Sequence, residues 1–109
     1  MSNLTVAEVL ERAADLIEPE GAWTQGAYAR DVLGNNLNPD EQWGPSPTAV
    51  CRCMYGAVAE VARPNGYQYL PPSGSWGLPG TEWNDAPERT QAEVVAKLRE
   101  AAALARAAS

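Results

Sequence analysis

The sequence predicts an all-α protein: a small orthogonal bundle of three main helices and a short helix, with a long aromatic loop rich in Gly and Pro. Three observations favour this fold class. Two segments begin with helix-capping patterns and continue with apolar residues at helical spacing. A third apolar segment starts at a Ser-Pro pair, and alanine is abundant throughout. A chain of 109 residues has room for one hydrophobic core, so we expect residues 1–109 to form a single domain.

The first main helix is predicted to begin at a capping box, in which Thr5 caps the first turn and Glu8 reaches back to the start of the helix. Apolar residues then recur on one face, and charged residues occupy the other. Pro19 stops this helix. A short helix is expected over residues 27–33, ending at Gly34, because glycine readily takes the left-handed conformation that terminates many helices.

The second main helix is predicted to start with Ser46 as N-cap and Pro47 as its first residue, and to end before Pro64. On this helix the side chains of Cys51 and Cys53 would diverge by about 200°, so a disulfide between them is not expected. The second Cys or His pair that a zinc site needs is missing from the sequence. We therefore expect two structural thiols, with Cys51 the more reactive.

Residues 67–80 contain many turn-forming residues and no apolar period, which predicts a long irregular loop. Thr90 and Glu93 then form a second capping box. The last main helix is expected to continue from there to about residue 107.

Fourteen Asp and Glu residues against eight Lys and Arg residues give a formal net charge of −6. The chain therefore lacks the basic surface with which proteins bind nucleic acids or anionic membranes. It contains no His, which excludes catalysis and metal ligation by imidazole. No signal peptide and no apolar run of about 20 residues is visible, so we expect a cytoplasmic protein without a membrane segment, metal or cofactor.

Polar and aromatic residues gather at two predicted helix junctions. They are Trp23, Gln25 and Arg30 at the first, and Trp83, Asn84, Asp85 and Arg89 at the second. If the junctions meet, these side chains would form one binding patch, in which Asp85 pairs with Arg89 and orients the guanidinium toward an anionic ligand. The alternative is structural, because the same residue types fill cores, cap helices and bind exposed backbone groups.

Trp43 and Trp76 lie in loops rich in Gly and Pro, where burial of an indole in the core is less automatic. Tryptophan is enriched among the residues that dominate binding at protein interfaces. We include both as candidate binding residues.

Two short sequence elements are similar to those of a known protein family. One is W-x-Q-G, beginning at Trp23, and the other is W-N-D-x-x-x-R-T, beginning at Trp83. With shorter matches in 13–17 and 49–57, the chain resembles a family of small proteins from actinobacteria and their phages. That family has no assigned activity, so the resemblance implies a bacterial or phage origin and no particular chemistry.

These observations favour a non-enzymatic interaction protein, for instance a phage factor that binds and modulates a host protein. A second hypothesis is a protein that binds a small polar, nucleotide-like ligand by stacking on Trp and pairing with Arg89. A third is a hydrolase that uses only carboxylate and Arg chemistry. The sequence contains no phosphate-binding loop, nucleophile elbow or metal-binding helix motif, so the enzyme hypothesis has the least support.

Overall fold

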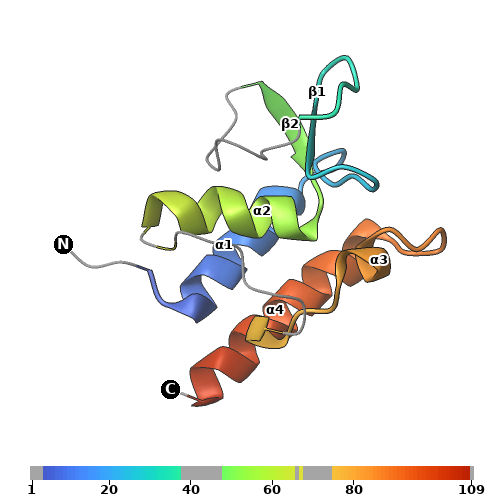
Figure 1. The fold of residues 1–109 in the computed structure, drawn as a ribbon. Coiled ribbons are helices and arrows are strands. Elements are labelled where there is room, and N and C mark those ends of the chain that lie inside the picture. The colour runs from blue at the N-terminus through green and yellow to red at the C-terminus, as the bar shows by residue number, and fades with distance from the viewer. Residues whose placement is uncertain (1–3, 38–47, 66, 68–74, 109) are drawn as a thin grey trace.

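The computed structural model describes residues 4–37, 48–65, 67 and 75–108 and shows a mixed α/β protein (Figure 1). The all-α prediction is therefore wrong. Besides four α-helices, the described residues contain a two-stranded antiparallel sheet. The helices pack together, and the two strands extend from one end of them (Figure 1). Across the described helices, none is long and apolar enough to span a membrane.

Both predicted capping boxes are confirmed. Thr5 N–H donates to Glu8 Oε1 (2.8 Å) and Glu8 N–H donates to Thr5 Oγ1 (3.1 Å), at the start of α1. Thr90 and Glu93 exchange the equivalent bonds, at 2.9 and 3.2 Å, at the start of α4. The backbone N–H of each threonine holds the pKa of its glutamate partner below the usual value. The sequence thus predicts the start of a helix correctly where a capping box within one turn determines it.

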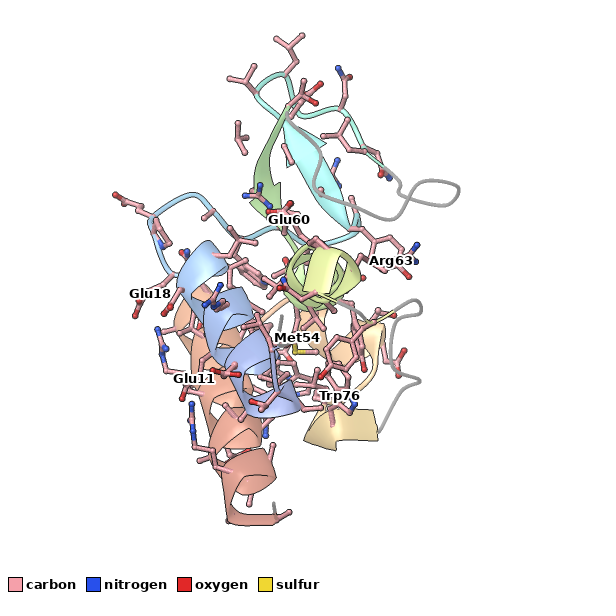
Figure 2. The ribbon with its side chains drawn as sticks, turned by 90° about the vertical axis from the view of Figure 1, so that its left-hand side faces the viewer. Glu11, Glu18, Met54, Glu60, Arg63 and Trp76 are labelled. Atoms are coloured by element: carbon pink, nitrogen blue, oxygen red, sulfur yellow. The ribbon has the colours of Figure 1, made fainter. Side chains whose placement is uncertain are left out.

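The hydrophobic core lies where α1 (Val6–Ile17) packs against both α2 (Met54–Ala62) and α4 (Gln91–Ala108). Alanine is frequent at these contacts, which lets the helix backbones approach closely. Met54, at the first turn of α2, points into this core (Figure 2). The largest fully buried apolar side chains are Leu10, Ile17, Met54, Leu78, Leu98, Val9, Val58 and Val94.

Ion pairs join the outer faces of α1 and α4. Arg99 lies 3.1 Å from Asp15 and 3.0 Å from Glu18, and Arg106 pairs with Glu11. All of these side chains are solvent-exposed to a substantial degree, so water and salt screen each pair and its contribution to stability is small. The core, rather than these pairs, holds the two helices together.

Residues 27–33 do not form the predicted helix. They contain β1 (Ala29–Asp31), which pairs with β2 (Ala49–Arg52). The register shifts within the pairing and leaves Val50 as the extra residue of a β-bulge. Gly34 does adopt a positive φ of 83°, but it lies in the turn after β1 instead of at a helix end. We call β1, β2 and this turn the ribbon.

The second main helix starts at Met54, so the prediction of a start at Pro47 is wrong. Residues 49–52 are strand because β1 pairs with them, and this pairing overrides their helix propensity. The N-cap is Cys53, whose Sγ accepts the N–H of Gly56 at 3.3 Å. Cys51 lies on β2 instead of on a helix, and both thiols are free, as expected.

Short elements connect α2 to α4. They are η1 (Arg63–Asn65), η2 (Ser75–Gly77) and α3 (Thr81–Asn84). α3 contacts α2, and the chain then turns into α4. This arrangement places the second candidate junction beside the start of α2, next to the base of the ribbon.

Candidate functional site

The structure brings the two candidate junctions together through Asn84. This side chain is 1% exposed and makes four hydrogen bonds. Its Oδ1 accepts from Trp23 Nε1 (2.8 Å) and from the backbone N–H of Met54 (3.1 Å). Its Nδ2 donates to the carbonyl of Thr24 (3.2 Å) and to Asp85 Oδ1 (2.9 Å). Every donor and acceptor site of the amide is used, so Asn84 connects three chain segments and has none left for a ligand.

Gln25 and Asp85 extend the same junction. Gln25 Nε2 donates to the carbonyls of Asn84 (2.9 Å) and Ala86 (2.7 Å). Asp85 Oδ1 also accepts the backbone N–H of Gly26 at 3.0 Å. Gln25 therefore satisfies backbone acceptors at the end of α3, and one oxygen of Asp85 holds the loop that follows Gln25.

The Arg30 guanidinium is bound within its own segment. It donates to Thr24 Oγ1 (3.1 Å), to the carbonyl of Gln25 (3.1 Å) and to that of Gly34 (3.2 Å). Three oxygen acceptors thus fix this side chain beside the base of the ribbon. Arg30 stabilises the loop conformation instead of extending toward the second junction.

Arg89 pairs with Glu93 (3.6 Å) instead of with Asp85. Its Nε donates to the carbonyl of Trp83 at 2.9 Å, and its guanidinium lies 3.9 Å from the centre of the Trp83 ring. The stacking and the hydrogen bond together hold Arg89 against α3. The predicted arginine clamp for an anion therefore does not form in this conformation.

Of the two loop tryptophans that were candidate binding residues, the structure describes Trp76. Trp76 is half-buried against the core, and its ring meets Tyr67 edge to face with centres 5.2 Å apart. Its backbone φ is positive, at 59°. This conformation is strained for a residue other than glycine, so the surrounding packing must hold Trp76 in it. Trp43 lies outside the described residues.

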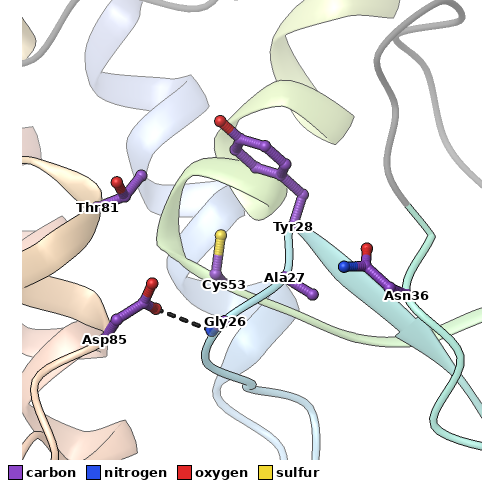
Figure 3. Close-up of a pocket in the computed structure, with 7 residues that line it drawn as sticks. All are labelled: Gly26, Ala27, Tyr28, Asn36, Cys53, Thr81 and Asp85. Carbon is purple, nitrogen blue, oxygen red and sulfur yellow. Dashed lines mark hydrogen bonds between the residues drawn. The ribbon is translucent and has the colours of Figure 1, made fainter.

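A pocket of about 240 Å³ opens beside the junction (Figure 3). Its lining residues are Gly26, Ala27, Tyr28, Asn36, Cys53, Thr81 and Asp85. Thr81 and Asp85 form one wall, Ala27 and Tyr28 the opposite one, and Cys53 lies between them (Figure 3). Of the predicted binding residues that the structure describes, only Asp85 lines this pocket.

Burial raises the pKa of the Cys53 thiol to about 11. We expect iodoacetamide to modify Cys51 in the native protein at about pH 8, and Cys53 only after unfolding, because about one Cys53 in a thousand is then a thiolate. Intact-mass measurement over time checks this prediction. Native labelling that persists at the same rate in a Cys51→Ser variant would contradict it.

Large apolar side chains are exposed on the ribbon. Val32 and Leu33, in the turn after β1, are 81% and 82% exposed, and Val50 at the bulge is 49% exposed. We call these three residues the ribbon patch. Among the described residues the other large apolar side chain with high exposure is Leu104 on α4, at 61%. No three metal-ligating side chains of the described segments lie close enough together to hold a metal ion.

Comparison with known proteins gives one match. The model of a family of unknown function, DUF6197, matches residues 1–104. The chain belongs to the DUF6197 family. No curated protein and no solved structure matches it. The match covers the ribbon, the pocket and the helices of this DUF6197 member except the last four residues of α4, so both candidate surfaces lie inside the family region.

Sequence reasoning missed the ribbon patch and most of the pocket. Thr81, Asn36 and Tyr28 come from three segments that converge only when β1 forms and α3 meets α2. One local signal was present: Val32 and Leu33 stand directly before Gly34-Asn35-Asn36. Two large aliphatic residues beside a turn sequence are unusual, because turns favour polar residues and glycine.

Proposed function

We propose that this protein is a non-enzymatic interaction protein that docks on an apolar surface of a protein partner through the ribbon patch. The observation that carries the proposal is the exposure of Val32 and Leu33, at 81% and 82%. When a partner covers exposed large apolar side chains, their removal from water lowers the free energy of the complex. Exposed apolar surface of this kind marks interaction sites in many proteins.

The turn that presents these side chains is well ordered by hydrogen bonds. Asp31 Oδ1 accepts the backbone N–H of Leu33 (3.0 Å) and of Asn35 (2.9 Å), and the Asp31 carbonyl accepts that of Gly34 (2.9 Å). The backbone N–H of Asn35 holds the pKa of Asp31 below its usual value. A turn fixed in this way loses little conformational entropy on binding, which favours affinity.

The charge distribution around the patch also supports a protein partner. Arg30 and Asp31 cancel each other at the end of β1, and Arg52 on β2 pairs with Glu60 at 2.9 Å. Together with Glu60 of α2, the ribbon thus has no net charge on a chain whose net charge is −6. The three residues of the ribbon patch are uncharged, and interface centres are depleted of charged residues.

The cellular setting is part of the proposal. The resemblance to proteins of actinobacteria and their phages suggests a bacterial host protein as the partner. Free thiols at Cys51 and Cys53 fit a reducing cytoplasm. Binding of a nucleotide-like ligand at Arg89 has less support, because that guanidinium is already stacked on Trp83 and paired with Glu93.

The test compares the wild type with a Val32→Ser/Leu33→Ser variant in crosslinking pull-downs from an actinobacterial lysate. We expect a discrete crosslinked partner whose yield falls by about tenfold in the double variant, because the centre of an interface carries most of its binding energy. The matched control is Leu104→Ser, which removes an equally conspicuous exposed aliphatic side chain from α4. It should leave the yield unchanged.

Two results would contradict the proposal. In one, the serine variants at the ribbon and at Leu104 affect capture equally. In the other, sedimentation velocity shows a wild-type dimer that the double variant abolishes, which would assign the ribbon patch to self-association. Both variants change solvent-exposed side chains, so circular dichroism should show wild-type folding in each.

A further inference from the structure

The pocket beside the junction contains a carboxylate with one oxygen fixed and one available. Asp85 Oδ1 accepts from Gly26 N–H (3.0 Å) and from Asn84 Nδ2 (2.9 Å), which sets the orientation of the carboxylate. Within the described part of the chain, Asp85 Oδ2 has no hydrogen-bond partner. Asn84 is in turn held by three further hydrogen bonds, so the carboxylate has a rigid support.

We propose that this pocket binds a protonated amine or a guanidinium group, with Asp85 as its counter-ion. The lining offers further acceptors for N–H donors in the hydroxyl of Thr81 and the amide oxygen of Asn36. Tyr28 adds an aromatic ring to the opposite wall, a surface that attracts cations. The Cys53 thiol between the walls is neutral because burial disfavours its thiolate.

Charge favours a cation over an anion or a neutral ligand. None of the described residues that line the pocket is basic, and three neutral acceptors, on Thr24, Gln25 and Gly34, hold the nearby Arg30 guanidinium outside the lining. Among the described lining residues, a cation therefore meets one carboxylate and no positive group. The net charge of −6 adds a long-range attraction for cations.

The size of the pocket limits the ligand. About 240 Å³ is below the range of about 300–1,000 Å³ that holds drug-sized molecules. It suits one short chain that ends in a cationic group. Two sources provide this chemistry: a free small amine or guanidine, and a Lys or Arg side chain presented by a protein.

The experiment uses N-butylguanidinium as the probe and N-butylurea as its neutral isostere. Titrations of the full chain are followed through the backbone amide signals of Gly26, Ala27 and Tyr28. We expect saturable shifts with butylguanidinium in the millimolar range, which is typical of a ligand with so few contacts, and at least about tenfold weaker binding of butylurea. This comparison needs only the wild-type protein, so it holds whatever the stability of the variants.

Asp85→Asn is the decisive variant, because asparagine keeps the oxygen that Gly26 and Asn84 bind and removes the charge. It should weaken butylguanidinium binding at least about tenfold, since a charge-assisted hydrogen bond becomes a neutral one. Glu82→Gln is the matched control: it removes an exposed carboxylate from α3, the helix that Asp85 caps, outside the pocket, and should bind as the wild type does. Equal shifts from the cation and the urea, or undiminished binding by a folded Asp85→Asn variant, would overturn the proposal.

A second arm identifies the source of the cation. A capped tripeptide with Arg between two Ala residues is compared with its Gln counterpart and with butylguanidinium. Tighter binding of the Arg peptide than of butylguanidinium assigns the pocket to a protein ligand, and the reverse order assigns it to a free small molecule. The site does not depend on the ribbon patch, so the Val32→Ser/Leu33→Ser variant should bind butylguanidinium normally even if the interaction proposal fails.

Discussion

Replacing Asn84 by Ala is expected to lower the free energy of unfolding by about 3–5 kcal/mol. The substitution removes four hydrogen bonds from a side chain that is 1% exposed. It leaves the part-buried Trp23 indole N–H and the buried Met54 backbone N–H without their acceptor, and a fully buried unpaired donor costs about 1–3 kcal/mol. The free energy of unfolding of a typical domain is about 5–15 kcal/mol, so the substitution would remove a large share of it and raise the fraction of unfolded molecules. Urea denaturation followed by far-UV circular dichroism measures the change.

The control for this prediction is Asn65→Ala. Asn65 makes one side-chain bond, from Nδ2 to the Val61 carbonyl (2.7 Å), and is half-buried at the end of η1, which follows α2. Its removal should cost about 1 kcal/mol. If Asn84→Ala is no more destabilising than Asn65→Ala, the junction does not depend on the Asn84 amide, and the rigid support that we assign to Asp85 is lost with it.

Local patterns predicted the parts of the fold that local interactions determine. α1 and α4 begin where Thr5 and Thr90 each exchange hydrogen bonds with the glutamate three residues later. Such a capping box can be recognised from four consecutive residues. The inward face of α1 followed from apolar spacing alone, and so did that of most of α4. These elements need no information from distant parts of the chain.

The ribbon could not be predicted in this way. Ala29–Asp31 and Ala49–Arg52 are short, lack the alternation of a half-buried strand and contain alanine, which favours helix. Each becomes a strand because it pairs with the other across about 20 residues of chain. Ser46-Pro47 resembles a helix start, whereas the residue that caps α2 is Cys53, a residue type that is not among the usual N-caps.

The candidate site was predicted in part. The sequence indicated that the Trp23 and Trp83 turns are rich in polar groups, and the structure joins them through Asn84 and Gln25. It could not indicate that Asn84 and Gln25 would bind each other's segments instead of a ligand. That outcome depends on atomic distances between segments about 60 residues apart in the sequence.

Replacing Gly56 by Ala is expected to destabilise the protein by about 3 kcal/mol or more. A Cβ at this position would lie 1.9 Å from the Tyr28 carbonyl oxygen and 2.9 Å from its carbonyl carbon. The same oxygen accepts the backbone N–H of Cys53 at 3.1 Å, so moving Tyr28 away breaks a bond at the start of α2. Overpacking of this kind costs about 1–3 kcal/mol when side chains can adjust, and here backbone meets backbone. Alanine is the better helix former by about 1 kcal/mol, which offsets only part of the loss.

Gly21→Ala is the control for this prediction, because it adds a methyl group to a glycine without creating a close contact. Gly21 has a positive φ of 82° and nothing within 4 Å of an added Cβ, so its substitution should cost only the backbone strain of about 1–2 kcal/mol. Urea denaturation of both variants gives the comparison, and the amide shift of Tyr28 reports the displacement directly. Tyr28 also lines the pocket, so Gly56→Ala should weaken butylguanidinium binding, whereas Gly21→Ala should not. A Gly56→Ala protein as stable as Gly21→Ala, with an unshifted Tyr28 amide, would mean that α2 and the loop before β1 are further apart than the structure places them.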